Sequence, residues 1–353
     1  MTSMFATSRY ISPIVNIRRE RTLPIPGKIL VRRGQRVNAM DPIAEGILNP
    51  KHLVLNIAHG LGVSVGEVDQ HLQCGEGVQL LKGDIIAGPV GRSRRVVRAP
   101  ESGRVIQIAT GKILYEVETI PFQLKAGLTG NVVEIISNRG AVVETTGALI
   151  QGVWGNDLIG SGNLIVRADT SDEVLSTNKL DTSLRGTILA VGTCEDEEVL
   201  KTAESLPLRG LIFASMRPDL IPTAVEIKVP VILMEGYGNC PMNAAAFELL
   251  TRNNGHTVCV NAQGWDRYKG IRPEIVIPKL HLEGKDSSDV IMSFCPDQTV
   301  RVTRAPNAGQ IGRLVNLIGY TVMPSGIRTQ AAEVLMENEV VNVVPLANLE
   351  ILE

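Results

Sequence analysis

The order of apolar and polar residues changes twice along the chain. Over the first 168 residues, short Val- and Ile-rich runs alternate with Gly, Pro and Asp turns, which is typical of an all-β sandwich or barrel. Between residues 180 and 282, runs that are apolar throughout alternate with amphipathic segments, which predicts a parallel sheet with helices on both faces. Short alternating runs return from about residue 290. We therefore predict a multidomain α+β protein.

We divide the chain into an N-terminal arm (1–23), a β-rich region (24–168), an α/β domain (180–282) and a C-terminal barrel (290–353). The α/β domain has the pattern of a small Rossmann-like or flavodoxin-like unit. Its expected strands are 186–193, 210–215, 229–234, 256–261 and 274–277, and its expected helices are 195–205, 217–227 and 242–253. Just before this domain, residues 160–162, GSG, are predicted as a turn.

A weak internal repeat lies in the β-rich region. Residues 29–46, ILVRRGQRVNAMDPIAEG, and residues 72–88, LQCGEGVQLLKGDIIAG, place Gly, an apolar residue, Asp and Ile-Ala in the same order. Glycine in such turns supplies positive φ, and aspartate supports the tight turn. Residues 99–105, APESGRV, follow, and residues 130–132, GNV, echo residues 103–105, GRV. The echo predicts a further related hairpin.

This repeat resembles the barrel-sandwich hybrid fold of biotinyl and lipoyl carrier domains, over roughly residues 24–117. The resemblance implies a modifiable lysine at a hairpin tip, and the sequence departs from the family there. No lysine follows Met40, and Lys82 occupies an ordinary turn position in the second copy. We therefore expect no covalent cofactor, and added biotinyl or lipoyl mass on the native protein would contradict this.

The C-terminal segment resembles the KOW-type SH3-like barrel of transcription elongation and ribosomal proteins. The alternating Val300 and Val302 precede residues 309–314, GQIGRL, which match the family's GxxGxV except that Leu314 replaces the usual Val. The arginines of this segment are candidates for phosphate contact in a nucleic acid, because no acidic residue lies between Asp297 and Glu333. They are Arg301, Arg304, Arg313 and Arg328. Solvated strand faces or interdomain contacts are the alternative.

Composition narrows the classes of function. Hydrophobic residues make up 44% of the 353-residue chain, so each domain has enough apolar surface for a core. Aromatic residues make up only 3%, which argues against stacking platforms for single-stranded nucleic acid. The formal net charge of −2 gives no overall attraction for polyanions. Basic runs at 18–21, 32–33 and 92–104 leave local phosphate contact open, with solvated strand faces as the alternative.

The five cysteines are scattered, without a CxxC pair, which argues against a zinc ribbon or a disulfide framework and favours a reducing cytoplasm. The histidines show no metal-binding spacing, so we expect no metal or other cofactor. No apolar run is long enough for a signal peptide or a membrane span, so we expect no membrane insertion.

The loop after the third α/β strand is the best candidate for a ligand site. Open α/β sheets bind ligands where strands end, and the free N–H groups at the start of the next helix hold anions. The candidates here are Glu235, Gly236, Tyr237, Gly238, Asn239, Cys240 and Asn243. The loop has neither a GxGxxG fingerprint nor a GK[ST] sequence. A tight turn with Glu235 as a surface acid is the alternative interpretation.

The loop after the fourth strand adds Trp265, Arg267 and Arg272, which either face a ligand or pack on the neighbouring β domain. Cys240 has only His256 as a candidate base in this domain, so we assign no catalytic residue. We predict a non-catalytic scaffold or adaptor that contacts a protein partner or a second copy of the chain, with nucleic acid as a further candidate partner. The alternative is an α/β module that binds a small anionic ligand or carries an enzymatic activity at residues 235–243.

Overall fold

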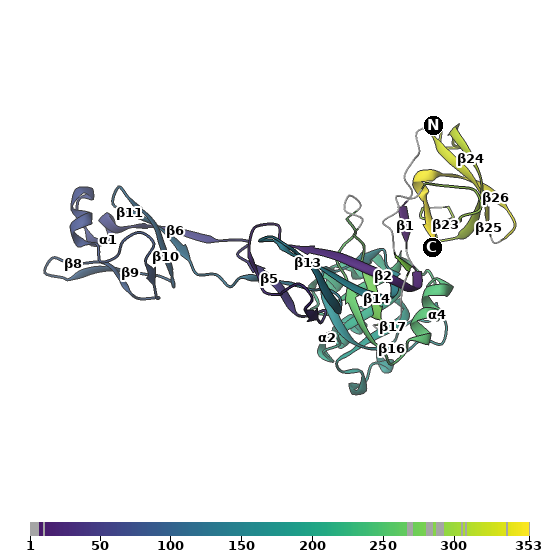
Figure 1. Ribbon diagram of the computed structural model, residues 1–353, viewed down its shortest axis with the longest axis horizontal. Helices are drawn as coiled ribbons and strands as arrows, with labels where there is room; N and C mark the ends of the chain where they lie inside the picture. Colours follow the sequence, from purple (N-terminus) through teal and green to yellow (C-terminus); the bar gives the residue numbers. More distant parts are fainter. Residues whose placement is uncertain are drawn as a thin grey trace.

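The computed structural model describes residues 7–9, 11–266, 271–279, 285–286, 293–304, 306–307, 309–336 and 338–352. This part of the chain is a β-rich α+β structure with several sheets, one of which contains a parallel segment with interleaved helices. The molecule is elongated, with a small β unit at one end, a large sheet in the middle and a C-terminal sheet at the other end (Figure 1).

The largest sheet has twelve strands. Its main path runs through β15 (Trp154–Gly155), β19 (Val231–Tyr237), β18 (Gly210–Met216), β17 (Thr187–Cys194), β16 (Ile159–Val166), β20 (Thr257–Asn261), β21 (Glu274–Pro278), β14 (Gly140–Gln151), β13 (Gly130–Ile136) and β4 (Arg36–Val37). In addition, β2 (Ile11–Thr22) pairs with β14, and β22 (Lys285–Asp286) pairs with β2. The four strands from β16 to β19 are parallel.

Helices cover both faces of the parallel segment. On one face, α2 (Glu197–Ser205) and α3 (Ile221–Glu226) share a buried core with β17, β18 and β19. On the other face, α4 (Ala244–Arg252) packs in a second core. Short 3₁₀ turns complete the connections: η2 (Thr177–Lys179), η3 (Thr182–Leu184) and η4 (Pro218–Leu220). The predicted strands and helices between residues 186 and 277 are confirmed, with ends that differ by a few residues.

The predicted turn at residues 160–162 is wrong, because these residues lie inside β16 and pair antiparallel with β20, while residues 163–166 of the same strand pair in parallel with β17. Their glycines serve close packing. A Cβ at Gly160 would lie 1.9 Å from the carbonyl oxygen of Arg209, and one at Gly162 would lie 2.8 Å from that of Gly186. Glycine inside a strand often marks such a close backbone approach.

The weak repeat in the sequence corresponds to two similar β units, which we call the proximal copy and the distal copy. The proximal copy contains β3 (Lys28–Ile29), β4, β5 (Pro42–Gly46), β12 (Phe122–Lys125) and β13. The distal copy contains β7 (Gln79–Leu80), β8 (Ile85–Val90), β9 (Arg95–Arg98), β10 (Gly103–Ala109), β11 (Lys112–Val117), β6 (Lys51–Asn56), α1 (Ile57–Leu61) and η1 (Val65–His71). The distal copy is inserted between β5 and β12 of the proximal copy.

The two copies share their turn chemistry. In the proximal copy, the N–H of Asn38 donates to Asp41 Oδ2 at 2.8 Å, and in the distal copy the N–H of Leu81 donates to Asp84 Oδ2 at 2.8 Å. Each copy then has a glycine opposite the residue just before this turn. Gly130 pairs with Val37, and Gly103 pairs with Leu80. β13 forms an antiparallel hairpin with β14, as β10 does with β11, so the predicted related hairpin at residues 130–132 is present.

The C-terminal sheet has six strands in the order β1 (Thr7–Arg9), β27 (Leu349–Leu352), β23 (Thr299–Val302), β24 (Ile311–Val322), β25 (Arg328–Met336) and β26 (Val341–Pro345), with η5 (Leu346–Asn348) before β27. Its own apolar core includes Val300, Leu314 and Val334. β1 pairs in parallel with β27, and β2 then joins the central sheet, so the start of the chain connects the two sheets.

Candidate functional site

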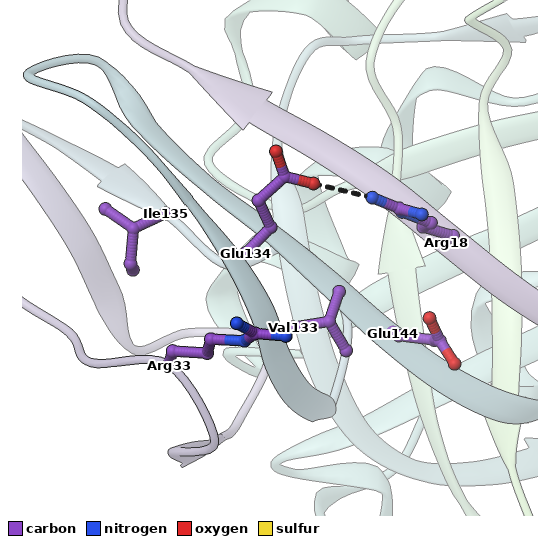
Figure 2. A pocket seen from close by; sticks show the side chains of 6 residues that line it. All are labelled: Arg18, Arg33, Val133, Glu134, Ile135 and Glu144. Atoms are coloured by element: carbon purple, nitrogen blue, oxygen red, sulfur yellow. Dashed lines mark hydrogen bonds and ion pairs between the residues drawn. The ribbon is translucent and has the colours of Figure 1, made fainter.

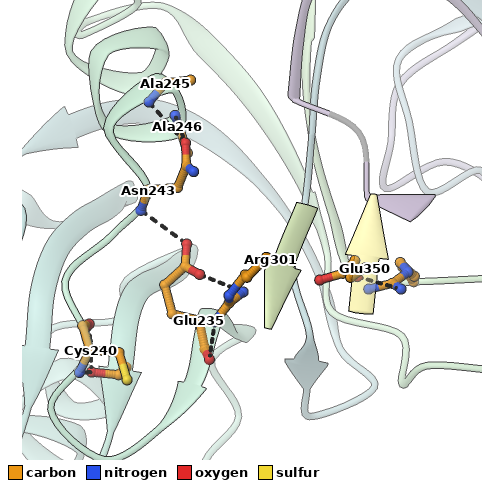
Figure 3. A network of polar contacts seen from close by, with 9 residues as sticks. Glu235, Cys240, Asn243, Ala245, Ala246, Arg301 and Glu350 are labelled. Atoms are coloured by element: carbon orange, nitrogen blue, oxygen red, sulfur yellow. Dashed lines mark hydrogen bonds and ion pairs between the residues drawn. The ribbon is translucent and has the colours of Figure 1, made fainter. Parts of the chain in front are cut away.

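The candidate loop begins with a buried charged pair that joins it to the C-terminal sheet. Glu235 lies near the end of β19, and its Oε2 is 2.6 Å from Arg301 Nη1 on β23. Both side chains are buried, at 5% and 7% exposure. Arg301 Nη2 also donates to the carbonyl oxygen of Glu235 at 3.0 Å (Figure 3). Glu235 is therefore not a surface acid.

A second buried pair lies beside the first. Arg272 Nη2 is 2.7 Å from Glu350 Oε1 on β27, with side-chain exposures of 5% and 4%. The Arg272 guanidinium also lies 4.5 Å from the centre of the Trp265 ring. Arg301 and Glu350 face each other across β23 and β27, so the two pairs are neighbours. This geometry favours packing of the second candidate loop on the neighbouring β unit.

These charges need their partners. An unpaired ion in a low-dielectric environment loses its hydration without compensation. Each pair takes one residue from the α/β segment and one from the C-terminal sheet, and the direction of charge alternates between the pairs. Separation of the two units would therefore expose or orphan four ions. We conclude that these residues form a joint between the units.

The N-terminus of α4 is satisfied by protein oxygens. Asn243 Oδ1 accepts from Ala245 N at 2.9 Å, and the N–H of Asn243 donates to Glu235 Oε1 at 3.0 Å. Helix N-termini attract anions because their first N–H groups lack partners. The carboxylate of Glu235 thus occupies part of the place that the sequence assigned to a ligand anion.

The rest of the loop packs against its surroundings. Gly236 and Gly238 have φ of 103° and 104°, a conformation that favours glycine. Cys240 bonds Ser215 Oγ through both its N–H and its carbonyl oxygen, each at 3.0 Å. Tyr237 is 39% exposed and lies 6.2 Å from the Trp154 ring. Asn239 is exposed. Arg267 lies outside the described residues.

The four arginines proposed from the C-terminal sequence have different environments. Arg301 is buried in the joint. Arg313 is exposed and lies 3.0 Å from Asp297. Arg304 and Arg328 are exposed, and within the described residues neither has an ion-pair partner. The structure therefore brings Arg301 together with Glu235, whereas the sequence assigned those two residues to different sites.

An open hollow of about 610 Å³ is lined by residues of β2, β13 and β14 and by Arg33 (Figure 2). Two of its acids have protein contacts, because Glu134 lies 2.7 Å from Arg18 and Glu144 accepts from Asn16, outside the lining, at 3.1 Å. We find no nucleophile with a base in this lining, so the hollow indicates no reaction.

Metal and thiol chemistry also lack a centre in the described part of the chain. Among these residues, no group of three or more His, Cys, Asp or Glu side chains is placed to hold a metal ion. The cysteines are free thiols, and burial raises the pKa of Cys194 to about 12. No helix among the described residues has the length and apolar character to cross a bilayer.

Comparisons with known proteins do not assign the chain to a family. No family model matches the chain, and no curated protein matches it either.

Proposed function

We propose that this protein is a non-catalytic scaffold that works by contact with other macromolecules. The Glu235–Arg301 pair carries this proposal. Through this pair, the loop that was the best candidate for a ligand site instead joins the central sheet to the C-terminal sheet. A joint of buried ion pairs holds two units in one orientation, which a scaffold requires. The free thiols are compatible with a reducing cytoplasm, which we retain as part of the proposal.

The proposal includes a finer description of the fold. The paired turns at Asp41 and Asp84 support two barrel-sandwich-like units. The strand order in the parallel segment supports a Rossmann-like or flavodoxin-like middle unit. The small antiparallel sheet with its own core supports an SH3-like C-terminal barrel. None of these fold types requires a catalytic role.

The C-terminal sheet offers a docking surface. Alternate residues of β25 and β26, such as Val334 and Val344, are buried in its core. The opposite face, which we call the outer face, contains Leu335, Val341 and Val343 at 39%, 51% and 46% exposure. Leu335 and Val341 are direct cross-strand neighbours. Strands that are apolar on both faces are typical of sheets that are covered on both faces.

The proposed occupant of the outer face is a second copy of this chain. Ten large apolar side chains on β24 to β26 and their connections are 39–65% exposed. They are Val315, Leu317, Ile318, Tyr320, Val322, Ile327, Leu335, Val340, Val341 and Val343. Only part of this apolar surface lies on the outer face itself, because Leu317 pairs with the buried Ala332 on the core side of β25. Arg313 and Glu333 lie beside the outer face and carry opposite charges, so two copies need not repel each other.

Sedimentation velocity over a concentration series tests this assembly. We expect a dimer for the wild-type chain and a monomer for the double variant Val341→Lys, Val343→Lys, because desolvation of two lysines opposes association. Val54→Lys is the matched control, since Val54 is 67% exposed on β6 and should leave the dimer intact. A wild-type chain that is monomeric at every concentration would overturn the second copy as occupant.

A ligand screen tests the alternative of an anion-binding α/β module. Thermal unfolding with nucleotides and phosphorylated metabolites should be unchanged, because Glu235 and Asn243 already satisfy the helix start. A true ligand at 100 times its Kd would stabilise the fold by about 2.7 kcal/mol. Such a shift, if lost in the Asn243→Ala variant, would replace the scaffold by a ligand-binding function.

A further inference from the structure

The end of the distal copy carries a cluster of arginines that the scaffold proposal does not use. β8 and β9 form a hairpin, and its turn lies at the end of the molecule far from the C-terminal sheet (Figure 1). We call β8, β9 and their turn the arginine hairpin. Arg92, Arg94 and Arg95 are exposed at its tip.

The backbone holds this tip in a defined shape. The N–H of Arg94 donates to the carbonyl oxygen of Gly91 at 3.2 Å, and Val90 pairs with Arg95 where the strands meet. The side chain of Arg95 lies against the end of α1, because a Cβ on Gly62 would be 2.4 Å from its Nη1. The residues of α1, IAHGL, include no acid, so this contact leaves the guanidinium charge unneutralised.

No carboxylate of the described residues pairs with the arginines at the tip, and most acids of the distal copy have other contacts. Residues 51–118 contain 8 Lys or Arg and 7 Asp or Glu, so this segment is nearly neutral overall. The positive charge at the tip arises because three arginines lie together there. Glu101 contacts Lys51, and Glu116 contacts Arg104. Other carboxylates accept local hydrogen bonds; these are Glu67, Glu76 and Asp84. Within the described residues, Arg92, Arg94 and Arg95 have no carboxylate partner.

We propose that the arginine hairpin binds the phosphate backbone of a nucleic-acid duplex. Guanidinium groups bind phosphate through two parallel hydrogen bonds, so three of them on a rigid tip match a row of phosphates. A two-stranded β ribbon is also narrow enough to enter a major groove. The proposal extends beyond the scaffold function, and it places the nucleic-acid contact at the end of the molecule opposite the proposed C-terminal arginines.

The residues around the tip do not favour two other anionic partners, single-stranded nucleic acid and a membrane surface. Single-stranded nucleic acid is bound largely by aromatic stacking, and the only aromatic residue between 47 and 121 is Tyr115, which is fully buried. Membrane surfaces are bound by apolar side chains that insert beside basic ones. The turn at residues 91–94, GRSR, has no apolar side chain to insert.

Fluorescence anisotropy with labelled DNA and RNA duplexes of about 20 base pairs, or two helical turns, tests the proposal on the full chain. We expect binding that weakens between roughly 50 and 200 mM salt, with a slope in log K against log salt near −3 for three phosphate contacts. The triple variant Arg92→Gln, Arg94→Gln, Arg95→Gln should lower the magnitude of the slope by about three. The corresponding lysine triple variant should keep the slope, because it keeps the charges.

A second triple variant, Arg304→Gln, Arg313→Gln, Arg328→Gln, is the matched control and should bind duplexes like the wild type. Loss of binding in this control but not in the hairpin variant would overturn the proposal. So would the absence of binding to either duplex, or tighter binding to a single strand of equal length. Co-sedimentation with phosphatidylserine vesicles without duplex binding would instead assign the tip to a membrane surface.

Discussion

At the scale of residues, the joint depends on which side chains meet across the sheets. Val300 and Val302 indicate a strand from the sequence, and that strand is confirmed. The role of Arg301 was not predictable, because its partner Glu235 lies 66 residues away and in another structural unit. A charged residue between two buried valines was the only local signal. The hydrogen bond that Asn243 Oδ1 accepts from the N–H of Ala245 at the start of α4, in contrast, is a standard N-cap contact.

Replacement of Arg301 by alanine should destabilise the protein by about 3–5 kcal/mol, because it leaves the Glu235 carboxylate buried and unpaired. Urea unfolding followed by circular dichroism measures the change. Arg328→Ala, at an exposed position, should change stability by less than about 0.5 kcal/mol. The double variant Glu235→Leu, Arg301→Met should recover most of the loss, since it removes both charges. Equal losses in the single and double variants would contradict a role for the ion pair.

Cys194 predicts a dependence of stability on alkaline pH. Burial raises the pKa of this thiol from its ordinary value of 9.0 to about 12, so the folded state disfavours the thiolate. The stabilisation is complete below pH 9 and is lost as pH rises from 9 toward 12. We expect the urea midpoint to fall less steeply over this range in Cys194→Ala than in the wild type. Parallel curves for the two proteins would contradict the prediction.

At the scale of elements, the two copies explain what the sequence could and could not predict. The order of Gly, Asp and Ile-Ala identified the repeat, because those residues set turn geometry locally. The pairing of β4 with β13 was not predictable, since the whole distal copy lies between them in the sequence. The turn predicted at residues 160–162 was wrong for a related reason. Gly160 and Gly162 pack against the backbone of Arg209 and Gly186, which lie near them only in the folded chain.

The equivalent glycines of the two copies should respond alike to substitution. A Cβ at Gly103 would lie 2.2 Å from the carbonyl oxygen of Glu116, and one at Gly130 would lie 2.2 Å from that of Glu144. We expect Gly103→Ala and Gly130→Ala each to cost about 1–3 kcal/mol through overpacking, as measured by thermal unfolding. Gly66→Ala is the control, because a Cβ there has no atom within 4 Å. A neutral effect at only one of the two glycines would show that the copies differ in packing.

At the scale of the whole molecule, the insertion of one copy into the other produces the elongated shape in Figure 1. The two proposed contact surfaces lie at opposite ends of this shape. The arginine hairpin is at one end, and the outer face of the C-terminal sheet is at the other. Because the buried ion pairs fix the C-terminal sheet on the central sheet, the separation between the surfaces is a property of the fold.

Small-angle X-ray scattering should give a radius of gyration clearly above about 20 Å, the value for a compact domain of this length. The physical reason is that the distal copy projects from the central sheet. Data collected on the Val341→Lys, Val343→Lys variant avoid the contribution of self-association. A value near that of a compact domain would show that the distal copy folds back on the rest of the molecule.

The parallel pairing of β1 with β27 has a consequence for the synthesis of this protein. The strand Thr7–Arg9 is synthesised long before its partner Leu349–Leu352, because all the other described elements lie between them in the sequence. Proteins fold largely in the order in which their domains emerge. The proximal and distal copies and the parallel segment can form while the chain is still growing, but the edge of the C-terminal sheet has to wait. Until β27 has been synthesised, β1 remains without its neighbour, so this edge of the C-terminal sheet forms later than the units between them.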